Sequence, residues 1–248
     1  MSPDELTRSF ATAHPALVLS RSLQQRVDRK FLLSERSLES LLSRLQPSFS
    51  ALTAGNKFWA RYDSIYFDTE ERTLFHAHCR DRLPRFKVRI RRHVDRQLAF
   101  LEIKRKDANR RTTKYRLPVP VTQGGLCERE LAFIAEHMPA PGECTLAAVM
   151  SVAFQRLTLV ANEAMERLTL DRALLFAGVE RELHMPRLVV GEVKQEQFMN
   201  RSGSVSAFRT IRAREASFSK YCIGSALLSG VSANVFKPTL RAAARLIA

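Results

Sequence analysis

The stretch Phe86–Lys106 has the sequence FKVRIRRHVDRQLAFLEIKRK and contains two short segments in which charged and apolar residues alternate. Side chains of a β-strand point to alternate sides, so each segment places its charged residues on one face. The residues Asp95–Gln97 between the segments predict a short turn, and therefore an antiparallel hairpin. One face of this hairpin carries five cations and one carboxylate, which are Lys87, Arg89, Arg91, Lys104, Lys106 and Glu102.

A strand face with this many cations is unusual, although a polar, solvated face is ordinary for a single strand of a half-buried sheet. Like charges opposite one another destabilise a sheet unless something neutralises them. The pattern recurs in other alternating segments, where the charged residues on one face include Lys114, Arg116, Arg167, Glu192 and Lys194. The recurrence favours a bound anion that carries several charges.

Composition narrows the class of partner. The chain has 248 residues, and its 40 Lys and Arg against 25 Asp and Glu give a formal net charge of +15. Such an excess predicts a polyanionic partner, either nucleic acid, an anionic membrane surface or a phosphate polymer. The four cysteines show no CxxC spacing, which favours free thiols over a disulfide framework or a zinc site. No apolar run is long enough for a membrane-spanning helix, and we expect a cytoplasmic protein.

The remaining hydrophobic periodicity predicts further strands and helices around the hairpin. Strands are expected at residues 25–33, 62–68, 112–119, 149–160, 166–174 and 187–196, and helices at 35–45, 70–79, 128–137, 205–213 and 219–228. Pro118 and Pro120 predict a sheet edge at the end of the strand 112–119, because proline cannot donate to a ladder. Pro139–Gly142 is expected to be a linker.

The predicted fold class is α+β, with about eight strands that are ionic on one face and apolar on the other. Closing such a sheet into an antiparallel barrel satisfies both faces, since helices cover the apolar side and the ionic side lines a lumen. The few carboxylates in that lumen are candidates to hold a divalent metal, because hard cations take oxygen ligands.

Several segments taken together resemble the triphosphate tunnel metalloenzyme superfamily, and within it the branch of the vacuolar transporter chaperone (VTC) domain, a polyphosphate polymerase. The resemblance covers roughly Arg26 to Gly224. It implies an eight-stranded antiparallel β-barrel tunnel surrounded by helices, with an N-terminal arm at 1–24, a VTC-like tunnel domain at 25–230 and a C-terminal tail at 231–248. The segments that carry the resemblance are RVDRKF, SIYFDT, RFKVRIR, FLEIKRK, TTKYR, ERLTLD, GEVK and FSKYCIG.

The resemblance also implies roles for individual residues. Asp28 stands where the family usually has Glu, and Thr158 departs from the usual pattern after Arg156. The expected catalytic residues are Lys30, Arg89, Arg91 and Lys104. The expected phosphate-binding residues are Arg26, Lys87, Lys114, Arg156, Arg167, Lys194 and Lys220, and the expected ligands for Mn²⁺ or Mg²⁺ are Glu192 and Glu102.

Three functions are compatible with these residues. The first is transfer of the γ-phosphate of ATP to inorganic polyphosphate, and the second is hydrolysis of tripolyphosphate or a nucleoside triphosphate at the same site. The third is a non-catalytic module that binds polyanions. ATP and polyphosphate are the expected partners, and a membrane partner is left open. Nucleic acid is not expected, because aromatic residues are not interleaved with the cations; we expect Tyr62 in the core and a surface or helix-packing role for His93.

Overall fold

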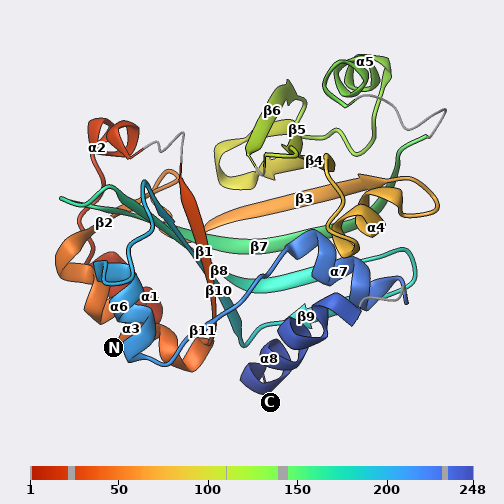
Figure 1. Cartoon of the computed structure of the whole chain (residues 1–248). Helices are drawn as coiled ribbons and strands as arrows, with labels where there is room; N and C mark the ends of the chain where they lie inside the picture. The colour runs from red at the N-terminus through yellow and green to blue at the C-terminus, as the bar shows by residue number, and fades with distance from the viewer. Residues whose placement is uncertain (1, 22–25, 110, 139–144, 231–233, 248) are drawn as a thin grey trace.

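The computed structural model describes residues 2–21, 26–109, 111–138, 145–230 and 234–247 (Figure 1). They form an antiparallel β-sheet with helices around it, as the sequence predicts. The expected linker Pro139–Gly142 lies outside the described residues. Segments 1–24 and 231–248 contribute helices to the fold, with Leu6, Phe10, Ala242 and Ala243 buried in the hydrophobic core.

The strands are β1 (Val27–Ser34), β2 (Phe49–Leu52), β3 (Ala60–Asp68), β4 (Arg85–His93), β5 (Leu98–Lys106), β6 (Thr112–Val119), β7 (Ala147–Ala161), β8 (Glu166–Ala177), β9 (Glu182–Met185), β10 (Leu188–Gln195) and β11 (Arg214–Glu215). The helices are α1 (Pro3–Arg8), α2 (Pro15–Ser20), α3 (Leu38–Leu45), α4 (Thr73–Cys79), α5 (Glu128–His137), α6 (Gly203–Thr210), α7 (Lys220–Leu228) and α8 (Lys237–Ile247). The expected hairpin is present as β4 and β5, which are joined by the 3₁₀ turn Val94–Arg96.

The sheet is open, whereas the sequence predicts a closed barrel. The strand order is β11-β1-β10-β8-β7-β3-β4-β5-β6, with β2 paired to β7 and β9 paired to β8. Within the described residues no ladder joins β6 to β11 or β1. Pro118 lies in β6 and has no N–H to donate, which fits an edge strand and confirms the predicted edge.

The open sheet is nevertheless strongly curved. In a flat sheet the five strand-to-strand steps from β1 to β4 would separate them by about 24 Å. In the structure, Lys30 Nζ of β1 donates to the Phe218 carbonyl oxygen at 2.8 Å, and Lys87 Nζ of β4 donates to Ser219 Oγ at 2.8 Å. Since Phe218 and Ser219 are neighbours in sequence, β1 and β4 face each other across the concave side, which we call the inner face.

Helices cover the outer face of the sheet and form two of the three hydrophobic clusters. On one half, α1, α3 and α6 pack onto β1, β7, β8 and β10. There the Phe208 ring stacks on Phe31 with centroids 4.4 Å apart, and a Cβ on Gly191 would lie 2.4 Å from that ring. On the other half, α5 packs onto β5 and β6 through Ile134 and Met138.

The third cluster lies on the inner face, at one end only. Here α7 and α8 pack on inward-pointing apolar residues such as Leu32 and Val190. A Cβ on Gly224 of α7 would lie 2.2 Å from Met150 Cε, so glycine allows the helix to approach β7 closely. Asp68 fixes α4 and α7 together, because its carboxylate accepts the N–H groups of Leu74 and Phe75 and the hydroxyl of Tyr221. Beyond α7, the inner face carries most of the charged side chains of the strands, with aromatic residues among them.

Candidate active site on the inner face

The ionic part of the inner face collects the residues that the sequence predicts for the site. The strand registers place many of the charged side chains of β1, β10, β8, β7, β4, β5 and β6 on the same side of the sheet, and α7 adds Lys220. The residues assembled in this way are Arg26, Lys30, Lys87, Arg89, Arg91, Glu102, Lys104, Lys114, Arg156, Arg167, Glu192, Lys194 and Lys220.

Glu102 is the centre of the first charge cluster. Its carboxylate is 2% exposed and accepts from Arg89 at 2.6 Å and from Arg116 at 3.0 Å, and it also pairs with Lys114. Burial opposes the charged form, but Arg89, Arg91 and Lys114 hold the pKa of Glu102 well below its usual range. Tyr66 fixes the other side of Arg89 through its hydroxyl, which accepts from Nη1 at 3.0 Å.

Asp171 is the centre of the second cluster, on β8. Arg156 Nε and Nη2 donate to its two carboxylate oxygens at 2.5 and 2.7 Å, which is the bidentate geometry that an Arg fork favours. Lys220 of α7 pairs with the same carboxylate. Burial opposes ionisation, yet the two cations hold the pKa of Asp171 well below its usual range. Asp171 therefore orients Arg156 and Lys220.

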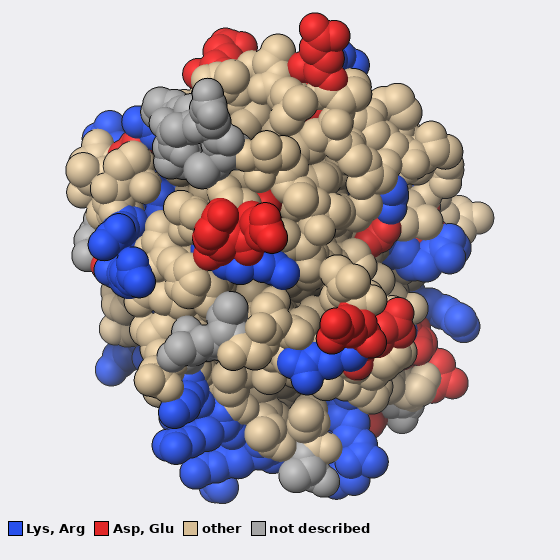
Figure 2. Space-filling view, turned by 90° about the vertical axis from the view of Figure 1, so that its right-hand side faces the viewer, with Lys and Arg blue, Asp and Glu red and all other residues tan. Residues whose placement is uncertain are grey.

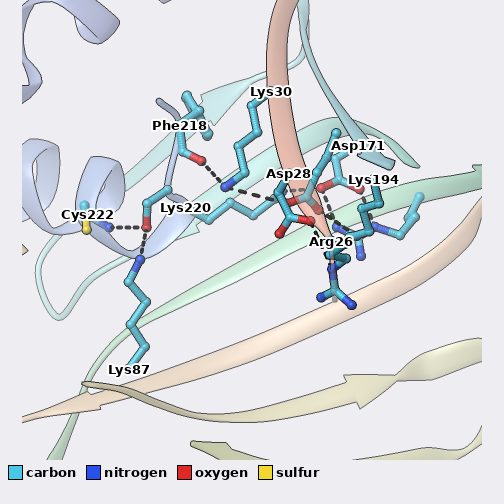
Figure 3. Close-up of polar contacts among 12 residues, drawn as sticks. Arg26, Asp28, Lys30, Lys87, Asp171, Lys194, Phe218, Lys220 and Cys222 are labelled. Carbon is cyan, nitrogen blue, oxygen red and sulfur yellow. Dashed lines mark hydrogen bonds and ion pairs between the residues drawn. The ribbon is translucent and has the colours of Figure 1, made fainter. Parts of the chain in front are cut away.

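Glu192 of β10 is the third inward carboxylate. Lys194 Nζ donates to it at 2.9 Å and Lys30 Nζ lies 3.9 Å away. These cations keep the pKa of Glu192 well below its usual range although burial opposes this. Asp28 lies on the neighbouring strand, opposite Lys194, and accepts from Arg26 at 3.0 Å (Figure 3).

The turn that precedes α7 joins three strands at the inner end of the site. Lys30 bonds to Phe218, Lys87 bonds to Ser219, and Lys220 pairs with Asp171 (Figure 3). Ser219 is also the N-cap of α7, where its hydroxyl accepts the N–H of Cys222 at 3.3 Å. Three consecutive residues thus hold β1, β4 and β8 at fixed separations.

Four inner-face cations have no carboxylate partner among the described residues. Lys104 and Arg167 make no hydrogen bond or ion pair there, Lys87 donates only to Ser219, and Arg91 donates only to Ser64 at 3.2 Å. Lys104 is exposed to the space above the inner face even though strands surround it. Desolvation by those strands, together with Lys87 and Lys30, lowers the pKa of Lys104 to about 8. Burial and the neighbouring Arg89 lower the pKa of Arg91 to about 10.

Sequence reasoning missed several residues that organise the site. Arg116 and Tyr66 are not among the predicted site residues, although each lies on a strand of the inner face with the correct parity. The alternation in the segment YDSIYFD of β3 places Tyr62, Ser64 and Tyr66 on the inner face and was the available signal.

The expectation that aromatics are not interleaved with the cations is wrong. On the inner face the Tyr62 and Phe154 rings stack with centroids 5.4 Å apart, and the Arg91 and Arg156 guanidinium groups lie over both rings at 5.2–5.8 Å. The Arg116 guanidinium lies 4.9 Å from the Phe100 centroid. The interleaving arises across strands, so it leaves no trace along the sequence. Tyr62 accordingly lies half-buried on this face rather than deep in the core.

Outside the inner face, the surface charges, cysteines and helices do not point to a second site. Figure 2 shows a side of the outer surface on which Lys and Arg are mixed with Asp and Glu. Cys79, Cys127 and Cys222 are free thiols, as predicted. The described residues contain no group of three or more His, Cys, Asp or Glu that could hold a metal. None of the helices in the described part of the chain is long and apolar enough to cross a membrane.

A curved antiparallel sheet with an ionic inner face and helices outside defines a tunnel-type fold. Residues 25–229 match the family model of the VTC domain, and the chain belongs to that family. The resemblance inferred from the sequence is thereby confirmed. None of the curated proteins matches the chain.

The chain is similar to several solved structures, of which one, with a TM-score above 0.5, supports the fold. The chain is similar to HpAC1 from Hippeastrum, a candidate adenylyl cyclase with a dominant triphosphatase activity, with a TM-score of 0.51, 12% identity, and coverage of 82% of this chain and 96% of that chain. It is also similar to a candidate adenylate cyclase from Bacillus halodurans, with a TM-score of 0.47, 14% identity, and coverage of 79% and 94%. The PH1819 protein from Pyrococcus horikoshii has a TM-score of 0.48, 10% identity, and coverage of 83% and 99%.

Proposed function

We propose that this protein is a polyphosphate polymerase that transfers the γ-phosphate of ATP to the end of an inorganic polyphosphate chain. The observation that supports this most strongly is the set of inner-face cations without a carboxylate partner, namely Lys87, Arg91, Lys104 and Arg167. Enclosed cations of one sign repel one another, and a chain of phosphates supplies the missing negative charge at regular intervals. Membership in the VTC domain family supports the same function.

The roles of the individual residues follow from their contacts. Glu102 and Tyr66 fix Arg89, so its remaining donor capacity is oriented before a substrate binds. Arg91 keeps most of its donors free for phosphate oxygens, which an Arg fork binds in bidentate fashion. Lys87 and Lys104 are directly opposite on paired strands and supply two adjacent point charges. Positioning and electrostatic stabilisation of this kind account for most of the catalysis of phosphoryl transfer.

The transfer itself is a substitution at phosphorus. An oxygen of the terminal phosphate of the chain attacks the γ-phosphorus of ATP. The bond from that phosphorus to the β–γ bridging oxygen breaks, and ADP leaves with the electron pair of the bond. Arg91 and Lys104 stabilise the charge that spreads over the transferring group.

The inner-face carboxylates fit a divalent metal that is bound largely through the substrate. Mg²⁺ in phosphate sites is commonly held by one or two carboxylates together with phosphate oxygens and water. Glu192 and Asp28 can supply the two carboxylates, whereas Glu102 is saturated by three cations and is less suited to the role predicted for it. When bound, Mn²⁺ or Mg²⁺ would neutralise phosphate charge and polarise the transferring group.

Hydrolysis by the same site is the alternative that a specific observation favours. HpAC1, which has a similar fold, has a dominant triphosphatase activity. The cations would hold the triphosphate in the same way, and water instead of a phosphate terminus would be the nucleophile. A third possibility, polyanion binding without turnover, uses the same unpartnered cations.

Products formed from ATP and Mn²⁺ by the purified protein distinguish these functions. A ladder of long polyphosphate on a gel, with release of ADP, is expected; orthophosphate alone would establish the hydrolase, and absence of turnover would leave a binding module. The Arg91→Ala variant should make no polymer, and Arg245→Ala, which removes an exposed arginine of α8, is the matched control. Polymer made by Arg91→Ala at the wild-type rate would refute the assignment of the site.

A further inference from the structure

The end of the inner face opposite α7 differs in chemistry from the phosphate-binding part. The strand β4 carries Lys87 beside α7, then Arg89 and Arg91, and ends at His93. Opposite these residues β5 carries Lys104, Glu102, Phe100 and finally Leu98. In the last two residue pairs of the hairpin, Arg91 opposite Phe100 and His93 opposite Leu98, Arg91 is the one charged side chain, and the other three are aromatic or apolar.

These side chains form one contiguous surface. The Phe100 and His93 rings meet edge to face at 5.8 Å, and His93 meets Tyr62 at 4.7 Å. Phe100, His93 and Tyr62 are each partly exposed, and Leu98 is 47% exposed although it is large and apolar. We call Tyr62, His93, Leu98 and Phe100 the aromatic ledge. It is accessible from solvent and is not sealed by any helix of the described chain.

The ledge carries no charge of its own at neutral pH. Burial and the nearby Arg91 lower the pKa of His93 to about 4, so the ring is neutral. Its Nε2 is buried and has no hydrogen-bond partner among the described residues, so the ring packs here as an apolar group. Cations surround the ledge instead, because Arg116 lies over Phe100, and Arg91 and Arg156 lie over Tyr62. A ligand that fits must be flat and apolar on one part and anionic on the next.

We propose that the aromatic ledge binds the base of a nucleoside triphosphate whose phosphates extend toward Lys104 and Lys87. A β-strand advances about 3.4 Å per residue, so along β4 His93 lies about 14 Å from Arg89 and about 20 Å from Lys87. A ribose with its phosphate chain can bridge the distance to Arg89, which directs the terminal phosphate toward Lys104 and Lys87. Base stacking on aromatic side chains is tolerant of the base's identity, and Arg adds a cation–π contribution. The ledge thus distinguishes nucleotides from inorganic phosphate chains, and this inference rests on the proposed triphosphate site.

The test compares two ligands that share a triphosphate but differ in the base. ATP and inorganic tripolyphosphate are titrated into the full chain in metal-free buffer by calorimetry, which prevents turnover. In Phe100→Ala the dissociation constant for ATP should rise at least about fivefold, while that for tripolyphosphate stays within about twofold. Phe100→Tyr should bind ATP like the wild type because it keeps the ring. Phe198→Ala, which removes an aromatic side chain that is 58% exposed on the outer surface, is the matched control.

The possible results distinguish the base site from the phosphate site. Retained binding of tripolyphosphate by Phe100→Ala shows that the variant is folded. Equal weakening of both ligands, or no change in either, would overturn the ledge as a base site while leaving the phosphate site intact. Failure of the wild-type protein to bind either ligand would overturn the proposed function and the ledge together.

Discussion

The two ends of the inner face are built from the same strands, yet one end is apolar and covered by helices, whereas the other is ionic. Next to α7, β1 and β10 present Leu32 and Val190, which pack against α7 and α8. Two residues along each strand, the same face presents Lys30 and Glu192. The apolar end is completed by the chain's own helices, which remove its surface from water.

At the ionic end, the carboxylates of the described residues do not pair with every cation. Three of its carboxylates, Glu102, Asp171 and Glu192, are each shared by two or more cations. Further cations remain without an acidic partner in the described residues, and Lys104 is the clearest case. The comparison teaches that paired cations maintain the architecture, whereas unpaired cations are available for an anionic ligand. Mutations that separate these two groups test it directly.

The largest expected effect is on turnover, through an unpaired cation. Lys104→Met should lower the rate of phosphate transfer or hydrolysis by at least about 100-fold, since a positioned charge contributes this much to phosphoryl-transfer transition states. The free energy of unfolding should not fall, because Lys104 pairs with no described residue and its removal relieves the desolvation of the amine and its repulsion from Lys87 and Lys30. Activity assays and urea unfolding measure the two quantities.

The control for this prediction is Lys237→Met, which removes an exposed lysine of α8 outside the site. It should change neither quantity. A stable Lys104→Met variant with wild-type turnover would contradict the division into paired and unpaired cations.

The strands of the ionic face were predictable because their alternation is local. The segments FKVRIRRH and LAFLEIKRK predict β4 and β5 almost to the residue, and parity then places their charged residues on one face, apart from Arg92 and Arg105. The short strands β2, β9 and β11 escaped prediction, since four residues or fewer carry no readable period. Local sequence patterns also could not predict whether the sheet closes. Closure depends on whether two edge strands that are far apart in the sequence pair with each other.

Pairing within the site was less predictable than its composition. Nothing local to Glu102 indicates that Arg89, Lys114 and Arg116 converge on it, because the three cations lie on two other strands. The resemblance suggested a metal role for Glu102, whereas its contacts are those of a counter-charge. The pairing depends on register and curvature, which are properties of the assembled sheet.

The second prediction concerns a paired group. Glu102→Gln leaves Arg89, Lys114 and Arg116 close together without their shared counter-charge, and should lower the free energy of unfolding by about 3 kcal/mol. Urea denaturation measures the loss. Asp63→Asn is the matched control, because the carboxylate of Asp63 pairs with Arg92 in a partly exposed position, and it should cost no more than about 1 kcal/mol.

Tripolyphosphate adds a second measurement to this variant. It should raise the melting temperature of Glu102→Gln more than that of the wild type, because the ligand replaces the missing negative charge. An unchanged stability in Glu102→Gln would mean that the cluster contributes little to the architecture, contrary to the comparison above.

The third prediction concerns the junction between the two ends. Tyr221→Phe removes the hydroxyl that bonds to the buried Asp68 and should destabilise the protein by about 1–2 kcal/mol. Since Tyr221 follows Lys220 at the start of α7, turnover should also fall severalfold through loss of the fixed position of Lys220 and Ser219. Tyr115→Phe, which alters a partly buried tyrosine of β6, should change stability by less than about 0.5 kcal/mol. A loss of stability without any change in turnover would show that the apolar end does not position the ionic end.

The smallest expected effect is the pH dependence of binding. Lys104 and Lys220 have pKa values lowered to about 8, in both cases chiefly by desolvation. Lys87 and Lys30 add to the lowering at Lys104, whereas Asp171 opposes it at Lys220. Each amine is charged below that pH and neutral above it. The affinity for tripolyphosphate should therefore fall severalfold between pH 7 and pH 9, measured by calorimetry at constant ionic strength.

Arginine at position 104 sharpens this measurement, because a guanidinium stays charged throughout the range. Lys104→Arg should flatten the fall in affinity, and the exposed control Lys237→Arg should leave it unchanged. In the ligand-free protein the sign is opposite for stability. Between the lowered pKa of about 8 and the ordinary value of 10.5, the unfolded chain binds more protons than the folded one, so these lysines make the free energy of unfolding rise with pH. If affinity and stability both fell with pH, the folded protein would raise the pKa of these lysines, as it does for a lysine paired with a carboxylate. The distinction between paired and unpaired cations would then be lost.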